Sequence, residues 1–185
     1  PSMYVVKKRN DTANWDMYHI GNDATAPETK HIYLNATNAV MDNVNRWNDT
    51  APTSSVFNLG DSLGINASGD TYVAYCFSEV KGYSKMGSYT GNGSSDGTFV
   101  YTGFRPAWLM VKRTDGSNDW VIFDNKRTPS NVIRKYLYAN SATQEDSASA
   151  GFSNMVDFVS NGFKLRNTFN NSNGSGVSVI YMAFA

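Results

Sequence analysis

The sequence has 185 residues, and its 16 Lys and Arg residues balance 16 Asp and Glu residues, so the formal net charge is zero. A chain without net charge has no general attraction to nucleic acids or to acidic membrane surfaces. Aromatic residues make up 14% of the chain, charged residues only 17%, and Asn occurs 21 times. This composition is typical of a β-rich protein with turn-forming loops, and it argues against a disordered chain.

Features that the sequence lacks exclude further classes of protein. No apolar run approaches the ~20 residues of a membrane-spanning helix. The sequence also has no basic segment followed by an apolar one, so it shows no sign of a signal peptide. Cys76 is the only cysteine, so no disulfide can form within the chain, and we expect it to be a small core residue between Tyr75 and Phe77. Because the chain begins at Pro1 rather than Met, we expect it to be a fragment of a longer polypeptide.

An internal repeat organises the chain. Residues 1–35 align with residues 106–140 without a gap, so that Trp15 falls on Trp120. The alignment then continues with two one-residue shifts to the end of the chain. We therefore predict a single β domain with an internal duplication. Its parts are copy one (residues 1–78), a connector (79–104) and copy two (105–185).

The expected secondary structure is a series of short strands separated by turns. Runs of β-branched and aromatic residues alternate with turn sequences such as Asp115-Gly116, and no ten-residue segment shows helical periodicity. Copy one is expected to form strands over residues 3–8, from Trp15, and over 32–35, 57–65 and 71–77, the last two as a hairpin. A strand over 98–104 is expected to end the connector, and copy two is expected to form strands over 108–113, from Trp120, and over 136–140, 163–167 and 177–184. This pattern predicts an all-β fold, a β-sandwich of jelly-roll or lectin-like type whose two duplicated halves share one core through a pseudo-twofold relation.

Groups suited to catalysis or metal binding are scarce. His19 and His31 occur only in copy one, have no cysteine neighbours and lack the spacing of a zinc motif. Only three Glu residues occur, and no pair of carboxylates stands out as the acid and base of a glycosidase. We therefore expect no catalytic residue, no metal and no cofactor, and we expect the protein not to be an enzyme.

Four residues are expected to have structural roles. Trp15 and Trp120 occupy equivalent places inside strands of the two copies, which favours packing in the core. Asp124 follows a strand and Arg127 comes three residues later, a spacing typical of an ion pair that fixes a loop.

Ligand contacts are expected in loops that differ between the copies, because loops carry function on rigid β scaffolds. Trp47 lies in a polar stretch of loop 39–55, whose counterpart in copy two is loop 144–155. We expect the Trp47 ring at the surface, stacked on a sugar, with neighbouring polar side chains bonding the hydroxyl groups. The candidates for ligand binding are Arg46, Trp47, Asn48, Tyr89 and Asn92.

Three motifs around copy two are distinctive. They are Gly103-Phe104-Arg105-Pro106-Ala107, residues 84–93 between the copies, and the closing residues 180–185. These motifs resemble an uncharacterised β-rich domain of tailed phages, common in marine phage genomes. There the domain occurs in virion and tail-fibre-like proteins, often near concanavalin-like lectin domains, and it has no established catalytic residues. Copy one departs from the pattern, because His19 and Asn22 stand where copy two has Asp124 and Arg127.

The resemblance implies a virion structural protein on the surface of the extracellular particle, a tail-fibre- or tail-spike-like appendage that recognises a host surface glycan. The alternatives are a capsid decoration or other virion surface protein without its own ligand, and a glycan depolymerase. Expected partners are other virion proteins and further copies of the chain, with a trimer for a fibre; neither nucleic acid nor membrane insertion is expected. Oligomerisation is also expected because copy one lacks the strand that residues 98–104 provide for copy two, which would leave an unpaired edge at residues 3–8.

Overall fold

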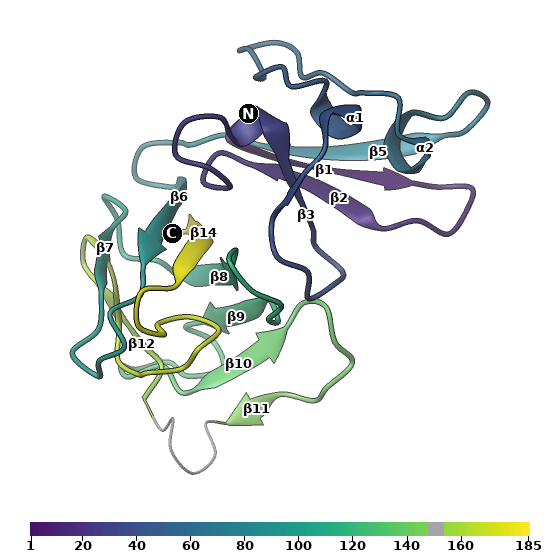
Figure 1. The fold of residues 1–185 in the computed structure, drawn as a ribbon. Coiled ribbons are helices and arrows are strands. Elements are labelled where there is room, and N and C mark those ends of the chain that lie inside the picture. Colours follow the sequence, from purple (N-terminus) through teal and green to yellow (C-terminus); the bar gives the residue numbers. More distant parts are fainter. Residues whose placement is uncertain (148–153) are drawn as a thin grey trace.

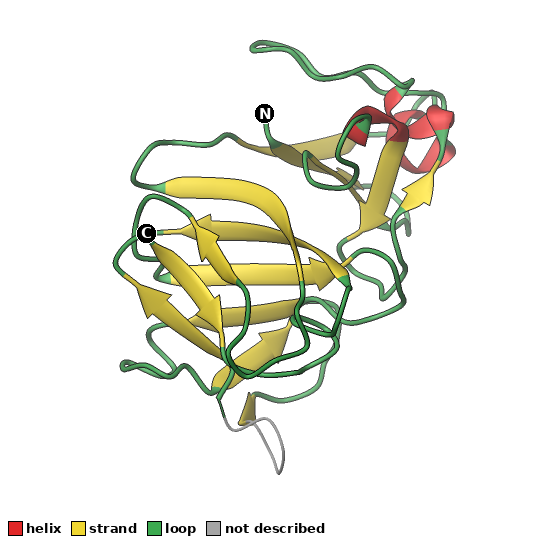
Figure 2. Ribbon diagram, turned by 60° about the vertical axis from the view of Figure 1, so that its left-hand side comes forward, coloured by secondary structure: helices red, strands yellow, loops and turns green. Residues whose placement is uncertain are grey.

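The computed structural model describes residues 1–147 and 154–185. Within these residues the chain is mostly β, with three antiparallel sheets and a few short helices (Figure 1 and Figure 2). The prediction of a β-rich fold is confirmed at this level. No helix in the described part of the chain is long and apolar enough to cross a membrane.

The first sheet lies at the top of Figure 1. Its strands, in spatial order, are β4 (Met41–Asp42), β3 (Lys30–Tyr33), β2 (Trp15–His19), β1 (Met3–Lys8) and β5 (Tyr72–Phe77). β1 pairs with β2 on one side and with β5 on the other. The predicted unpaired edge at residues 3–8 is therefore wrong, because β5 leaves the expected hairpin and pairs with β1.

The second sheet contains six strands and lies below the first in Figure 1. Its strands, in spatial order, are β11 (Asp146–Ser147), β10 (Lys135–Tyr138), β9 (Val121–Asp124), β8 (Trp108–Arg113), β14 (Ser178–Phe184) and β6 (Ser84–Thr90). β6 comes from the connector and pairs with β14 over seven positions. It has no counterpart in the first sheet.

The first and second sheets have the same strand order and register over five strands each. Met3 is opposite His19 in the β1–β2 ladder, and Trp108 is opposite Asp124 in the β8–β9 ladder. Both partners are displaced by the same 105 residues, from 3 to 108 and from 19 to 124. The β1–β5 and β8–β14 ladders also match position by position.

A side-chain hydrogen bond recurs at matched positions of the two sheets. Asn35 Oδ1 accepts from the backbone N–H of Trp15 at 2.9 Å. Asn140 Oδ1 accepts from the backbone N–H of Trp120 at 2.7 Å. In both sheets the asparagine thus ties the end of the third strand to the start of the second, and the sequence identity at this pair reflects the same local structure.

The third sheet consists of three short strands. In spatial order they are β12 (Val156–Val159), β13 (Gly162–Leu165) and β7 (Phe99–Tyr101). β7 confirms a strand within residues 98–104, but it pairs with β13 and not with β8. The strand predicted over residues 57–65 is wrong, since this segment forms a loop followed by α2 (Leu63–Asn66). Unlike β13, it has no neighbouring strand among the described residues to complete a ladder.

Two other short helical turns lie in copy one, η1 (Pro27–Thr29) and α1 (Val44–Trp47). The Asn43 side chain begins α1 by accepting from the backbone N–H of Asn45 at 3.0 Å, as an N-cap does. Asn48 ends the helix in a left-handed conformation with φ of 53°. Capping by asparagine explains why a polar sequence forms a helical turn here.

Buried apolar side chains form three clusters. One joins the second and third sheets and includes Phe163. Another is shared by the first and second sheets and includes Val5 and Met110. The last covers the opposite face of the first sheet, where Tyr4 meets Trp47 of α1. The central strands β1 and β2 of the first sheet are therefore buried on both faces, one against the second sheet and one under the helical turns.

Cys76 is exposed in β5, so the prediction that it is a core residue is wrong. Its counterpart Ala183 in β14 is fully buried. The difference has a structural cause, because Ala183 lies in the cluster between the second and third sheets, whereas the cluster on the matched face of the first sheet does not extend to Cys76. The local sequence predicted a strand, but the position of that strand at a sheet edge depends on distant segments.

Candidate functional site

A cleft of about 580 Å³ lies where the loop after β2 meets the second sheet, and we call it the inter-sheet cleft. The lining residues are 21–24 after β2, Lys30 of β3, Val40, 88–90 of β6, Thr114 and Asp115 after β8, and Ser178 and Val179 of β14. Its volume falls within the range of small-molecule sites. The lining is polar and apolar in about equal parts, and Ala24, Val40 and Val179 contribute to the apolar part.

Asn22 is the lining residue with unused hydrogen-bonding capacity. It is 8% exposed, and its backbone N–H donates to the carbonyl of His19 at 3.0 Å. Neither Oδ1 nor Nδ2 of its side chain has a hydrogen-bond partner among the described residues. Buried polar atoms in folded proteins are nearly always bonded. The Asn22 carboxamide therefore has hydrogen-bonding capacity that no described residue uses.

Two of the charged side chains of the cleft, Lys30 and Asp115, are paired with an opposite charge, and the third, Asp23, is held as a carboxylate by its own turn. Lys30 Nζ lies 2.6 Å from Asp42 Oδ2, and this hydrogen bond raises the pKa of Lys30. The Asp23 carboxylate accepts from backbone N–H groups of its own turn, which lowers its pKa. Asp115 accepts from the guanidinium of Arg113. The cleft consequently has no unpaired positive charge, and its one unpaired charge is the Asp23 carboxylate.

His19 fixes the end of β2 against β14 beside the cleft. Its Nε2 lies 3.0 Å from the carbonyl of Tyr181, and its Nδ1 accepts from the backbone N–H of Gly21 at 2.9 Å. These contacts place the ring proton on Nε2, and burial lowers the pKa of His19 to about 4, so the ring is neutral at pH 7. A Cβ at Gly21 would lie 2.9 Å from the carbonyl oxygen of Gly87. The close approach of the two sheets therefore requires glycine at this position.

Trp47 does not lie at the surface, so the prediction of an exposed ring is wrong. The side chain is fully buried, and its Nε1–H donates to the carbonyl of Lys30 at 2.8 Å. The ring meets Tyr4 edge-on, with 4.9 Å between ring centroids. α1 turns the ring toward β1, and a buried ring offers no face to a sugar.

Arg46 belongs to a buried polar cluster on the same face of the first sheet. Its Nη1 lies 3.2 Å from Asp16 Oδ1 and donates to Ser62 Oγ at 2.7 Å. Its Nη2 donates to the hydroxyl of Tyr33 at 2.9 Å. The guanidinium thus joins α1 to β2, β3 and the start of α2, a role in holding the helical turns on the sheet.

The ionisable groups of this cluster have perturbed protonation equilibria. Burial raises the pKa of Asp16 to about 6, although the charge of Arg46 acts against it. Burial and then the charge of Arg46 lower the pKa of His31 to about 4. At the matched positions of the second sheet Val121 stands for Asp16 and Tyr136 for His31. The shared sheet geometry therefore does not require these ionisable groups.

Asn48, the third residue predicted beside Trp47, is exposed at the end of α1. It lines a shallow hollow of about 390 Å³ together with Asn45, Asp61 and Asn66. The structure thus separates the predicted trio: one side chain enters the core, one enters the buried polar cluster and one remains at the surface. No single site contains all three.

Tyr89 lies in the inter-sheet cleft, as part of its wall. Its hydroxyl donates to the carbonyl of Ser172 at 2.7 Å, and burial raises its pKa far above the ordinary value. The ring packs against Phe163, with 5.9 Å between centroids. The structure therefore brings one of the sequence-predicted residues to the cleft, but its hydroxyl is already bonded to the protein.

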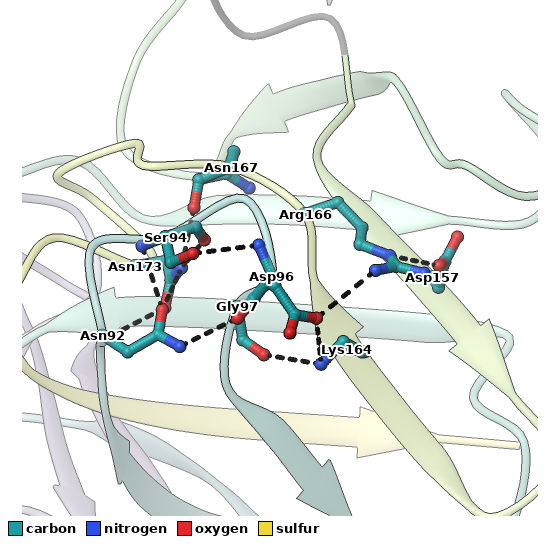
Figure 3. Close-up of polar contacts among 9 residues, drawn as sticks. All are labelled: Asn92, Ser94, Asp96, Gly97, Asp157, Lys164, Arg166, Asn167 and Asn173. Carbon is teal, nitrogen blue, oxygen red and sulfur yellow. Dashed lines mark hydrogen bonds and ion pairs between the residues drawn. The ribbon is translucent and has the colours of Figure 1, made fainter.

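Asn92 closes the loop over residues 91–97 and is not in the cleft (Figure 3). Its Nδ2 donates to the carbonyl of Asp96 at 3.0 Å, and its Oδ1 accepts from the backbone N–H of Ser94 at 3.0 Å. Fully buried Asn173 donates from Nδ2 to the carbonyls of Ser94 and Asn167 at 2.9 and 2.7 Å. This amide network holds the loop to the segment before β14.

Ion pairs anchor the same loop to the third sheet (Figure 3). Asp96 lies 2.9 Å from Lys164 Nζ, and Arg166 Nε lies 2.6 Å from Asp157 Oδ2. The Lys164 ammonium also donates to the carbonyl of Gly97 at 3.0 Å. Since the polar groups of this region bond one another, its structural role is sufficient to explain them.

The two matched tryptophans have different environments. Trp120 is 1% exposed, and its Nε1–H donates across to the carbonyl of Tyr33 in the first sheet at 2.9 Å. Trp15 is half-buried and stacks on Tyr75, with 6.2 Å between centroids. Trp120 is thus a core residue that joins two sheets, while Trp15 keeps part of its surface open to solvent.

Asp124 and Arg127 form the expected ion pair, with 2.9 Å between Oδ2 and Nε. Asp124 Oδ1 also accepts from the backbone N–H groups of Lys126 and Arg127 at 2.9 and 2.8 Å. This pair fixes the loop after β9. In the described residues no group of three or more His, Cys, Asp or Glu side chains is arranged to hold a metal ion.

Fold and site together define a β-rich domain with three antiparallel sheets and a cleft of mixed polar and apolar lining between two of them. Over residues 1–185 the chain matches the family described as a domain of unknown function (DUF7483), and it belongs to that family. No curated protein and no solved structure matches it.

Proposed function

We propose that this chain is a virion surface domain of a tailed phage, of the tail-fibre or tail-spike type, that binds a host surface glycan in the inter-sheet cleft. The observation that carries the proposal is the buried Asn22 carboxamide, which has no partner among the described residues. This observation supports a ligand site at the loop after β2 rather than at Trp47.

The chemistry of the cleft favours a carbohydrate among small ligands. A carboxamide can donate to one sugar hydroxyl and accept from another, as polar groups in ligand sites commonly do. Val40 and Val179 offer apolar surface to the C–H face of a sugar ring. Because Lys30 is paired with Asp42 and Asp23 is an anion, the cleft has no unpaired positive charge that would select a phosphate or a nucleic acid.

We expect this site to bind a glycan without cleaving it. A glycosidase needs a carboxyl group that holds its proton near neutral pH, together with a second carboxylate. The bonds that Asp23 accepts lower its pKa, so it is ionised and unsuited as the acid. The proposal therefore includes no catalytic residue, metal or cofactor.

The proposal extends to the origin of the fold. We infer that the first two sheets arose by duplication and face each other as a pseudo-twofold sandwich. The equal register at matched positions and the recurring asparagine bonds support the duplication. The cluster of buried residues shared by the two sheets supports the face-to-face packing.

The assignment to a phage particle rests on the resemblance of the motifs around residues 84–93, 103–107 and 180–185 to tail-fibre-like proteins. A neutral surface rich in Asn, Ser and Thr fits an extracellular particle. Further copies of the chain and other virion proteins are its proposed partners. A density map of a virion that carries the domain tests this part, since a tail-distal position supports receptor binding and regular capsid positions support decoration.

A glycan array followed by titration calorimetry tests the ligand site. Wild-type protein is expected to bind a glycan from the host surface. Asn22→Ala removes about two hydrogen bonds, worth about 2 kcal/mol in total, so affinity should fall roughly 30-fold. Its thermal stability should stay at or above that of the wild type, because a buried group without protein partners is lost.

Asn125→Ala is the matched control, because Asn125 stands near the corresponding place after β9 but does not line this cleft. Its affinity should equal that of the wild type. Equal affinity of Asn22→Ala and wild type for a bound glycan would remove the cleft from the proposal. Failure of the wild-type protein to bind any host glycan would favour a virion surface protein without its own ligand.

A further inference from the structure

The outer edge of β5 is an open strand edge in the described structure. β5 pairs with β1 on one side only, whereas the matched strand β14 pairs with β8 on one side and β6 on the other. Apart from the bond between Ser2 N–H and the carbonyl of Phe77, no backbone hydrogen bond joins β5 to any described segment except β1. Alternate N–H and C=O groups of β5 therefore point away from the sheet without partners.

β5 also lacks the features that protect exposed edges. It has no charged residue and no proline in Tyr72–Phe77. Tyr75 is 47% exposed, whereas the matched Met182 in β14 is 7% exposed. Natural sheets place charges, prolines or bulges on open edges to prevent pairing with other chains. An apolar and regular edge without these features is suited to pairing with a further strand.

An apolar cleft of about 270 Å³ opens beside this edge, and we call it the β5 cleft. Trp15, Tyr75 and Phe77 form its wall on the first sheet, and Met110 and Met182 form the wall on the second. It adjoins the cluster of buried residues that the two sheets share. Apolar side chains from a strand lying along β5 would be removed from water here.

The second sheet shows which kind of strand covers a matched edge. β6 lies antiparallel along β14, with Ser84 opposite Phe184 and Thr90 opposite Ser178. Its Met86, opposite Met182, is 2% exposed and packs into the shared cluster. Small or polar residues surround this methionine in β6. The ladder therefore combines continuous backbone bonds with one buried apolar side chain.

We propose that β5 is an acceptor edge for an antiparallel strand of the same chemistry as β6, supplied by a different protein and not by a second copy of this chain. The incoming strand completes the first sheet as β6 completes the second, and it places an apolar side chain opposite Tyr75, over the β5 cleft. Main-chain hydrogen bonds provide the affinity, and the cleft selects the side chain, as in other cases of strand addition. This interaction is independent of the glycan proposal, because the β5 cleft and the inter-sheet cleft share no lining residue.

The first experiment adds a synthetic peptide of residues 82–92 to the chain and measures amide hydrogen exchange. The peptide should bind with saturation at one per chain and slow exchange of the open β5 amides about tenfold or more. A peptide with Met86→Lys is the control, since it keeps the backbone bonds but brings a charge to an apolar cleft. It should bind at least about tenfold more weakly.

A second arm removes the dependence on peptide affinity. A copy of residues 84–105 is fused ahead of Pro1. The added β6 sequence then stands as far from Pro1 as β6 stands from Pro106 in the natural sequence. Tethering raises the effective concentration to about the millimolar range, so β5 should be protected and Tm should rise by several degrees. The same fusion with Met86→Lys in the added copy should give neither effect.

Two results would overturn the proposal. One is unchanged exchange at β5 with both the free peptide and the fused segment. The other is a dimer of the unmodified chain that already protects β5 and is not displaced by the peptide, which would make a second copy the natural occupant. Glycan binding is measured in parallel, and its loss or retention does not affect either conclusion.

Discussion

Replacement of Trp47 by alanine distinguishes a core residue from a ligand-stacking residue. The side chain is completely buried, meets Tyr4 and Tyr18 edge-on, and donates to the carbonyl of Lys30 at 2.8 Å. Truncation of a buried tryptophan to alanine costs about 3–5 kcal/mol, including the cavity left behind. We therefore expect Trp47→Ala to lower the free energy of unfolding by about 4 kcal/mol, a large part of the stability of an ordinary domain.

Urea unfolding followed by circular dichroism measures this loss without relying on tryptophan fluorescence. With a slope of about 2 kcal/mol per molar urea, the midpoint should fall by about 2 M. Trp47→Phe keeps most of the ring but leaves the Lys30 carbonyl without its donor, so it should cost about 1–2 kcal/mol. Trp15→Ala is the matched control, and it should cost clearly less than Trp47→Ala because Trp15 is only half-buried.

Two outcomes would refute this reasoning. A loss below about 1 kcal/mol in Trp47→Ala would mean that the ring contributes little to the core. A folded and stable Trp47→Phe variant that loses glycan binding would return Trp47 to the ligand site. Retained binding in that variant, together with the expected loss of stability, would support the structural role.

Further predictions concern protonation, close packing and the amide network. Burial lowers the pKa of His19 and of His31 to about 4. Each neutral histidine therefore contributes its full share to the free energy of unfolding above pH 6.5, and this share, about 3 kcal/mol, should be lost as the pH falls toward 4. Asp16, whose pKa burial raises to about 6, acts in the opposite sense and loses its contribution as the pH rises from 3.8 to 6. His19→Gln should therefore flatten the acid side of a stability profile measured as urea midpoints between pH 7 and 4; an unchanged slope would contradict the assignment. Gly21→Ala should lower Tm by several degrees and weaken glycan binding, because its Cβ would meet the Gly87 carbonyl at 2.9 Å; a tolerated alanine would show that the two sheets can separate there. Asn173→Ala should cost about 2–3 kcal/mol by breaking the buried amide network of loop 91–97, and proteolysis at that loop should become faster; an equally resistant loop would argue that the ion pairs alone hold it.

Local pattern was sufficient to predict many strands but not their neighbours. Residues 3–8 and 108–113 form strands as predicted, because their β-branched and aromatic residues suit a sheet buried on both faces. Residues 57–65 have a similar pattern to 163–167, yet only the latter segment begins a strand. A strand needs a neighbouring strand to pair with. The segment 163–167 has β12 and β7 as neighbours, whereas 57–65 has no such neighbour among the described residues. β12 directly precedes β13 in the sequence, but β7 lies about 60 residues earlier, so the local pattern does not contain this second partner.

The candidate site was harder to predict than the fold. Trp47 stands among polar residues, and this composition indicated a surface loop, but Asn43 and Asn48 act as caps of a helical turn that directs the ring inward. Arg46 meets Asp16 from a different element, so its burial follows from tertiary contacts. Asn22 carried a usable signal in the repeat itself, because it departs from the residue that the second copy has at that position.

The matched loops after β2 and β9 show how one scaffold can have two roles. After β9, Asp124 and Arg127 bond each other, and the carboxylate also accepts from the N–H groups of the turn, so the loop is satisfied by its own residues. After β2, His19 stands in place of the carboxylate and turns to the carbonyl of Tyr181, which ties the loop to the second sheet. Asn22 then has no anion to bond, and its carboxamide is left without a protein partner among the described residues. The presence of His19 instead of a carboxylate thus joins the first two sheets and also leaves the Asn22 carboxamide unbonded at the cleft between them. This difference between the two matched loops is the basis of the proposed binding site.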